Sequence, residues 1–163
     1  MKENKKIIII LSIILLIIDQ VSKIIVTLKY TVPIEGKFLS INLIQNEGIA
    51  FGMNDGNNKN IALTLIVLLI VVNFIVKQID KISIPNVIAV SLIFTGGISN
   101  LIDRIFRGGV VDFLKVTKFA IFNIADCYIV LGWIMMVFLL IMEIIPNSVK
   151  KENKKEVEDC EKK

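Results

Sequence analysis

The 163-residue chain contains no histidine and only two cysteines, Cys127 and Cys160. The lack of histidine excludes a histidine-ligated zinc protease. It also excludes a catalytic triad in which histidine activates serine or cysteine. One cysteine adjoins an apolar segment and the other lies near the charged end of the sequence, so they do not form a disulfide framework. Hydrolytic chemistry in this chain would have to use other groups.

Charged residues are scarce as well, at 21% against 55% hydrophobic residues, and the mean hydropathy is +0.74. This composition indicates a membrane protein. Four apolar stretches approach or reach the roughly 20 residues that cross a bilayer. We expect spans at about 7–27, 60–77, 84–104 and 124–145, within one membrane domain at 1–146. The first stretch lacks a small-x-small cleavage site, so we expect a true span rather than a signal peptide.

Basic residues are distributed unevenly among the connections between these spans. Eleven lie in the amino-terminal tail, the turn between the second and third spans, and the tail after Pro146. The two other connections hold seven. The positive-inside rule therefore places both termini in the cytoplasm. Acidic residues balance the basic ones in residues 147–163, which we expect to be a disordered cytoplasmic tail that does not bind nucleic acid.

The first span and the connection that follows it hold a few polar signals. Asp19 and Lys23 share a helix face at i, i+4 spacing, either as a self-neutralising ion pair or with Asp19 bracing a site. In the outer region, about 30–60, Phe38–Ile44 has the alternating pattern of a strand. Gly48 and Gly52 follow, where the backbone can adopt conformations closed to larger residues.

The stretch from Gly96 to Asp126 concentrates polar residues beside the last two apolar segments. Such groups are costly in lipid, so the stretch is a candidate functional site. The double glycine Gly96–Gly97 is typical of closely packed membrane helices. The polar side chains are three aspartates, two asparagines and two arginines: Asp103, Asp112, Asp126, Asn100, Asn123, Arg104 and Arg107.

Asp112 and Asp126 are separated by 13 residues. Because the third helix rises to the outer surface and the fourth begins there, both acids should lie at the same depth. One of two adjacent carboxylates tends to keep a proton, while its ionised partner can activate water. Three alternatives remain: salt bridges to Arg104 or Arg107, capping of the fourth helix by Asn123, or a cation site that adds Asp103.

At these positions the chain resembles bacterial lipoprotein signal peptidase, the type II signal peptidase. Five blocks carry the resemblance, in the family's order and over about residues 7–145. They are Asp19-xxx-Lys23, Asn46-x-Gly48-x-Ala50-Phe51-Gly52, Gly96-Gly97-xx-Asn100-xx-Asp103-Arg104, Gly109-Val-Val-Asp112-Phe113 and Phe122-Asn123-x-Ala125-Asp126.

The resemblance implies a membrane all-α fold of four transmembrane helices. A small extracytoplasmic β-cradle at 38–51 and a short amphipathic helix near 52–60 would accompany them. It implies an aspartyl endopeptidase of the bacterial cell membrane whose site faces the extracytoplasmic leaflet. We expect a monomer that uses no cofactor or metal. Surrounded by membrane lipids, the enzyme would cut diacylated prolipoproteins just before the lipidated cysteine.

Carried over by motif, Asp112 and Asp126 become the catalytic pair. The residues implied to bind substrate or support the pair are Asp19, Lys23, Asn46, Gly48, Asn100, Asp103, Arg104, Asn123 and Ala125. The chain departs from the family pattern at Ser99, where glycine is frequent, and at Ile49, where alanine is usual. The connection between the two aspartates is also shorter than usual, which leaves its substrate contacts open.

Other classes of protein also combine apolar spans with acidic residues. A small transporter that relays protons would place its coupling acid near mid-membrane, whereas these aspartates gather at one edge. A non-catalytic assembly factor would not require acids in both the glycine-flanked loop and the fourth helix. The Gly-x-Gly-Asp pattern of presenilin-type proteases is absent, because Gly-Gly-Val-Val precedes Asp112. The sequence therefore favours a protease.

Overall fold

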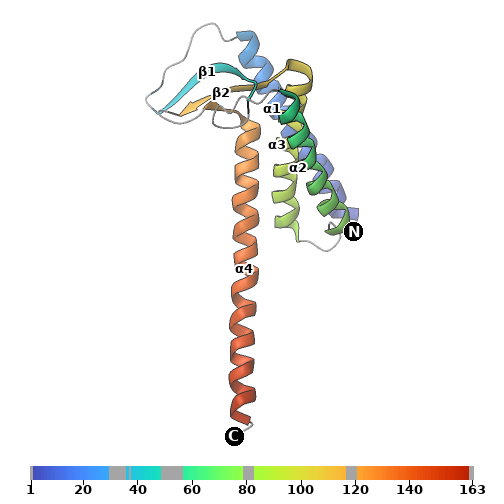
Figure 1. Cartoon of the computed structure of the whole chain (residues 1–163), viewed down its shortest axis with the longest axis vertical. Helices are drawn as coiled ribbons and strands as arrows, with labels where there is room; N and C mark the ends of the chain where they lie inside the picture. Colours follow the sequence, from blue (N-terminus) through green and yellow to red (C-terminus); the bar gives the residue numbers. More distant parts are fainter. Residues whose placement is uncertain are drawn as a thin grey trace.

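A computed structural model describes residues 2–29, 36, 38–48, 57–78, 83–116 and 121–161. Within them it contains four long helices and one small sheet (Figure 1). In chain order the elements are α1 (Lys2–Lys29), β1 (Leu39–Asn46), α2 (Asn57–Gln78), α3 (Ile84–Arg107), β2 (Val110–Val116), β3 (Ile121–Phe122) and α4 (Ile124–Glu161).

The four expected spans are confirmed, since each of these helices is long and apolar enough to cross a membrane. The chain is therefore a multi-pass membrane protein. In α1, α2 and α4, most of the apolar stretch is exposed, as suits contact with lipid. The corresponding stretch of α3 is 56% buried, because α1, α2 and α4 all pack against it. α3 is thus the central helix that positions the others.

Two adjacent glycines on α3 face different neighbours. A Cβ added at Gly96 would meet the Ala125 carbonyl oxygen of α4 at 2.5 Å, so only glycine allows this approach. A Cβ at Gly97 would meet the Leu68 side chain of α2 at 3.0 Å. The close helix packing expected at Gly96–Gly97 is confirmed. Because Gly96 has no Cβ, the beginning of α4 can pack directly against α3.

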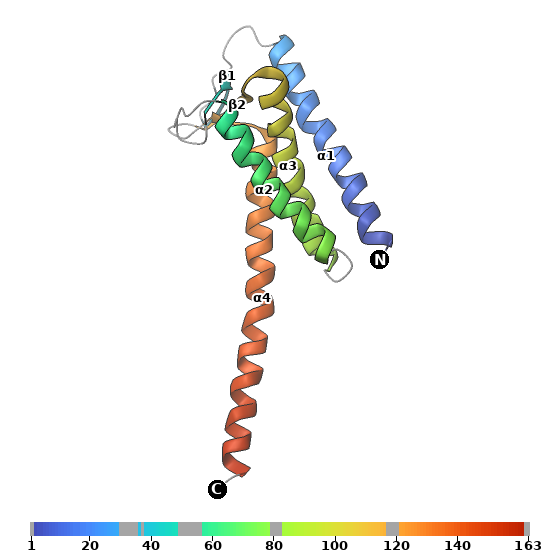
Figure 2. The same cartoon turned by 45° about the vertical axis from the view of Figure 1, so that its right-hand side comes forward.

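The sheet has the strand order β1-β2-β3, with both pairs antiparallel. It lies at one end of the helices, away from both chain termini (Figures 1 and 2). α3 ends at Arg107, and Gly108 adopts a φ of 78°, a left-handed conformation that favours glycine, as the chain turns into β2. The acid-bearing strand is therefore delivered directly from the end of the central helix.

The strand expected at 38–44 is confirmed as β1, and Asp112 lies on a second strand, β2, which extends to Val116. Of the region expected to form an amphipathic helix, residues 52–56 lie outside the described part of the chain. Residues 57–60 form the first turn of α2.

α4 also differs from the expected length. It continues to Glu161, so residues 147–161 are helical where a disordered tail was expected. Lysine and glutamate dominate this segment, and both have high helix propensity, which favours continuation of an established helix.

Candidate active site

Asp112 lies on β2 and is almost fully buried, with an exposed fraction of 3%. Its cross-strand partner is Ile44, which places Asn46 at the diagonal position on the same face of the sheet. Asn46 Nδ2 donates to Asp112 Oδ2 at 2.9 Å, and the Gly48 backbone N–H donates to Asn46 Oδ1 at 3.0 Å. The sheet thus supplies an amide that holds this carboxylate.

Opposing influences act on the pKa of Asp112. Burial raises it, the hydrogen bond from Asn46 lowers it, and the negative charge of Asp126 raises it again. The hydrogen bond from Asn123 and the charge of Lys23 also lower it, and the resulting pKa is about 6. Asp112 can therefore exchange a proton near neutral pH.

Asp126 occupies the third position of α4 and takes part in its amino-terminal cap. The Asp126 backbone N–H donates to Asn123 Oδ1 at 3.0 Å, and the Asn123 backbone N–H donates to Asp126 Oδ2 at 3.2 Å. This reciprocal arrangement is a capping box with asparagine and aspartate in its two roles. The capping by Asn123 that the sequence left as an alternative to a catalytic pair is present, and it fixes the position of Asp126.

Two buried asparagine side chains connect the two aspartates. Asn123 Nδ2 donates to Asp112 Oδ1 at 2.7 Å and to Asn100 Oδ1 at 3.2 Å. Asn100 Nδ2 in turn donates to Asp126 Oδ1 at 2.8 Å. The carboxylates of Asp112 and Asp126, on a strand and on a helix, therefore belong to one continuous hydrogen-bond network.

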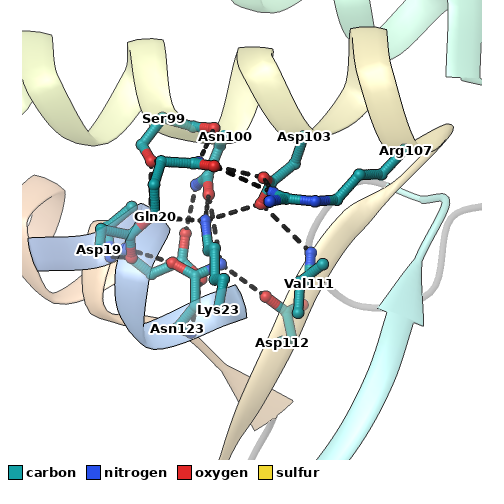
Figure 3. A network of polar contacts seen from close by, with 12 residues as sticks. Asp19, Gln20, Lys23, Ser99, Asn100, Asp103, Arg107, Val111, Asp112 and Asn123 are labelled. Atoms are coloured by element: carbon teal, nitrogen blue, oxygen red, sulfur yellow. Dashed lines mark hydrogen bonds and ion pairs between the residues drawn. The ribbon is translucent and has the colours of Figure 1, made fainter. Parts of the chain in front are cut away.

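Lys23 of α1 is completely buried at the centre of this network (Figure 3). Its ammonium lies 2.7 Å from Asp19 Oδ2 and 2.7 Å from Asp103 Oδ2, and it donates to Asn100 Oδ1 at 3.2 Å. The three N–H bonds thus meet three acceptors, which compensates the burial of its charge. The ion pair with Asp19 expected from the sequence is present, and Lys23 also pairs with Asp103 of α3.

Asp19 braces the beginning of α4, as one of its two interpretations predicted. Its Oδ1 accepts the Ala125 backbone N–H at 2.7 Å, one residue before Asp126. Its Oδ2 accepts the Ser99 hydroxyl at 2.5 Å in addition to Lys23. Ser99, which the sequence marked only as a departure from the family pattern, therefore contributes a side chain to the site.

Asp103 is held by groups that the sequence did not all identify. Besides Lys23, it accepts hydrogen bonds from Gln20 Nε2 at 3.1 Å and from the Val111 backbone N–H at 3.3 Å, and it pairs with Arg107. Arg107 also donates to Gln20 Oε1 at 3.0 Å (Figure 3). The position of Gln20, next to Asp19 on an otherwise apolar span, is the signal that could have identified it.

The alternatives proposed for the acids can be compared with these contacts. Asp103 pairs with two cations, Lys23 and Arg107, whereas a three-aspartate cation site would direct its carboxylate toward the catalytic candidates. Arg104 is half-buried, and its guanidinium is attracted to Asp126, Asp112 and Asp103. The contacts favour a linked pair, Asp112 and Asp126, over a cluster of three equivalent acids.

A four-helix membrane domain that buries two linked aspartates at one end has the features of a membrane-embedded enzyme. The family model described as signal peptidase (SPase) II matches residues 11–142. The chain belongs to the signal peptidase II family, and it is therefore a protease.

Individual relatives agree with the family model. The lipoprotein signal peptidase of Fusobacterium nucleatum is 39% identical over 152 residues, which cover 88% of this chain and 89% of that protein. The lipoprotein signal peptidase of Staphylococcus aureus is 35% identical over 153 residues, covering 88% and 91%. A bacterial membrane enzyme solved at 2.3 Å resolution is similar in structure, with a TM-score of 0.76 and 32% identity over 83% of this chain and 88% of that one.

Proposed function

We propose that the protein is an aspartyl endopeptidase that removes the signal peptide from diacylglyceryl-modified prolipoproteins just before the lipidated cysteine. The observation that carries the mechanism is the amide connection between Asp112 and Asp126, which holds two carboxylates in one network. The names of the similar proteins support prolipoproteins as substrates. The supporting residues are those implied by the family motifs, together with Gln20, Ser99 and Arg107.

The proposed reaction uses one ionised and one protonated carboxylate. The ionised aspartate takes a proton from water, and the resulting hydroxide attacks the carbonyl carbon of the residue before the cysteine. The protonated aspartate donates its proton to the carbonyl oxygen. As the tetrahedral intermediate collapses, the C–N bond breaks, the cysteine nitrogen receives the proton taken from water, and the carbonyl-side proton returns to its aspartate. The products are a carboxylic acid and an amine.

The surroundings of the two acids suggest how the roles are divided. Asp112 is buried and its pKa is raised to about 6, which suits the partner that carries the proton. Asp126 is partly buried, accepts hydrogen bonds from Asn100 Nδ2 and the Asn123 backbone N–H, and lies in the first turn of α4, where the helix dipole favours a negative charge. We therefore assign the proton to Asp112 and water activation to Asp126.

Substitution of the pair provides a direct test. Asparagine has nearly the size of aspartate but cannot exchange a proton, so Asp112→Asn and Asp126→Asn should each lower turnover by several orders of magnitude while the protein stays folded. The double variant should be little worse than either single variant, because groups that act as a unit are not additive. Turnover with the purified variants and thermal unfolding measure the two quantities. Substantial activity in either folded single variant would contradict the assignment.

The substrate class is tested separately. Purified protein is incubated with a diacylated prolipoprotein and with the same protein lacking the lipid, and the new amino terminus is sequenced. We expect cleavage of the lipidated form alone, immediately before the modified cysteine. Equal cleavage of both forms would refute lipid recognition without affecting the assignment of the aspartates.

The cation-site alternative predicts a different response to chelation. An aspartate pair that activates water directly should remain active in EDTA. Loss of activity that a divalent cation restores would instead favour a site that includes Asp103. Equal inactivation of Asp103→Asn, Asp112→Asn and Asp126→Asn variants would point the same way.

A further inference from the structure

Three asparagine side chains donate hydrogen bonds to the two aspartates. Asn46 and Asn123 each donate from Nδ2 to one oxygen of Asp112, and Asn100 donates from Nδ2 to Asp126. An asparagine amide has a donor end and an acceptor end, and a 180° rotation exchanges them. Each of these amides therefore has to be held in one of two orientations, of which only one supports a carboxylate.

The oxygen end of each amide faces a group that can only donate. Asn46 Oδ1 accepts the Gly48 backbone N–H, and Asn123 Oδ1 accepts the Asp126 backbone N–H. The third, Asn100 Oδ1, accepts from the Lys23 ammonium at 3.2 Å and from Asn123 Nδ2 at 3.2 Å. A backbone N–H or an ammonium has no lone pair to offer, so each contact fixes the oxygen end and turns the NH2 group toward an aspartate.

We propose that Lys23 is a positioning residue for the aspartate pair, because its ammonium locks the Asn100 amide with the NH2 group toward Asp126. The proposal rests on the proposed function of the pair. Two of the donors to these amide oxygens are side chains, Lys23 and Asn123, both on Asn100 Oδ1. Asn123 also donates to Asp112, so Lys23 is the one that can be replaced without removing a donor to either aspartate. Its lock can therefore be removed by substitution, whereas the locks on Asn46 and Asn123 belong to the backbone.

The environment of Lys23 explains what would happen without it. The ammonium lies between the carboxylates of Asp19 and Asp103, and its third N–H reaches Asn100. If the ammonium were absent, the Asn123 NH2 group would still donate to Asn100 Oδ1, but the two uncompensated acids would attract the NH2 group of Asn100 more strongly. The amide would then present its oxygen to Asp126 and oppose the ionised form that activates water.

Other charges also act on the pair, so the experiment has to separate orientation from charge. The groups near it are Asp19 and Lys23 of α1, Asp103 and Arg104 of α3, Asp112 of β2 and Asp126 of α4. Removing the charge of Lys23 disfavours negative aspartates whether or not Asn100 rotates. Only the orientation effect requires the Asn100 side chain, and a double-mutant cycle isolates it.

The cycle compares Lys23→Met, Asn100→Ala and the double variant, with Lys77→Met at the far end of α2 as the matched control for loss of a lysine. The pH dependence of turnover is measured for each protein. We expect Lys23→Met alone to move the acid limb upward by about 1 pH unit, equivalent to about tenfold lower turnover at a fixed acidic pH. In the Asn100→Ala background the same substitution should add less than about a third of that shift. An equal shift in both backgrounds would overturn the proposal.

A second measurement does not depend on catalysis. The carboxyl groups of the pair are titrated by infrared spectroscopy, with the spectrum of the Asp112→Asn/Asp126→Asn variant subtracted. The shift in carboxyl titration caused by Lys23→Met should again require the Asn100 side chain. If this dependence is observed but the aspartate variants retain proteolysis, the positioning role of Lys23 is supported and the proposed function is wrong. If the aspartate variants are inactive but the shift is independent of Asn100, the function stands and the lock fails.

Lys23→Met leaves two buried carboxylates without their cation and could prevent folding. The charge-matched variant Lys23→Met/Asp103→Asn removes one acid together with the base, which proteins tolerate better than the loss of one partner. In this variant, Asp19 keeps the Ser99 hydroxyl and the Ala125 N–H. The double-mutant cycle is therefore repeated in the Asp103→Asn background, with and without Asn100→Ala. The shift of the acid limb caused by Lys23→Met should again require Asn100. An equal shift with and without the Asn100 side chain would overturn the proposal.

Discussion

At the scale of single residues, the amide of Asn46 opposes the effect of burial on Asp112. Its hydrogen bond favours the ionised carboxylate and lowers a pKa that burial raises to about 6. Asn46→Ala removes this donor, so the pKa of Asp112 should rise. If Asp112 carries the proton, the basic limb of the pH–turnover profile, near pH 6 in the unchanged protein, should move to higher pH. Asn42→Ala on the same strand is the control, and a downward shift in Asn46→Ala would contradict the assigned role.

Cys127 follows Asp126 directly and could be mistaken for a nucleophile. Its thiol is free and half-buried, and its backbone N–H belongs to the first turn of α4 through a 3.3 Å bond to the Asn123 carbonyl. The chain has no histidine to activate the thiol. Cys127→Ser should therefore retain most activity, and thiol-alkylating reagents should not abolish turnover. An inactive but folded serine variant would contradict the aspartyl mechanism.

The sequence predicted those site residues whose relationships are local or carried by a motif. Asn123 and Asp126 are three residues apart, so their shared helical turn could be anticipated. Gln20, Ser99 and Arg107 were not assigned to the site because their contacts join α1 to α3 across about 80 residues of sequence. No local pattern specifies such a contact, since it depends on how the two helices are rotated against each other.

At the scale of elements, the approach of α4 to α3 depends on Gly96. A Cβ there would lie 2.5 Å from the Ala125 carbonyl oxygen and 2.6 Å from Ile129 Cγ1, so α4 would have to move. Gly96→Ala should destabilise the fold by about 1–3 kcal/mol, as expected for overpacking. It should also lower turnover, because Ala125 directly precedes Asp126. Thermal unfolding in detergent and turnover measure the two effects.

Gly97→Ala is the matched control for this prediction. Its added Cβ would meet only the Leu68 side chain, at 3.0 Å, and a flexible leucine can adjust more easily than a backbone carbonyl. We therefore expect a smaller loss of stability and little change in turnover. Equal effects at Gly96 and Gly97 would show that the contact with α4 is not the decisive one.

The elements themselves were predictable to different degrees. Apolar length was sufficient to identify the four spans, because the thickness of the bilayer imposes it. The pairing of β2 with β1 was not anticipated, since register between strands far apart in sequence depends on tertiary contacts. That pairing brings Asn46 to Asp112, so the hydrogen bond between these two side chains was not predictable from the sequence either.

At the scale of the whole molecule, both chain ends lie away from the sheet (Figure 1). The excess of basic residues in the two tails and in the segment between α2 and α3 predicts that this end faces the cytoplasm. Reporter fusions at Lys81 and after Lys150 should therefore report the cytoplasm, and a fusion at Asn57 the outside. A cytoplasmic signal at Asn57 would place the aspartates on the face opposite to the one we propose.

The ion pairs at the core of the site bear on how the molecule assembles in the bilayer. Asp19 and Lys23 neutralise each other within α1, and Asp103 and Arg107 do so within α3, each at i, i+4 spacing. Either helix can thus enter lipid with its internal acid already compensated, which reduces the penalty for inserting charge. When the helices meet, Lys23 reaches Asp103 as well, so an intrahelical pair becomes an interhelical bond. The residues that make each span insertable on its own are the same ones that join the two spans.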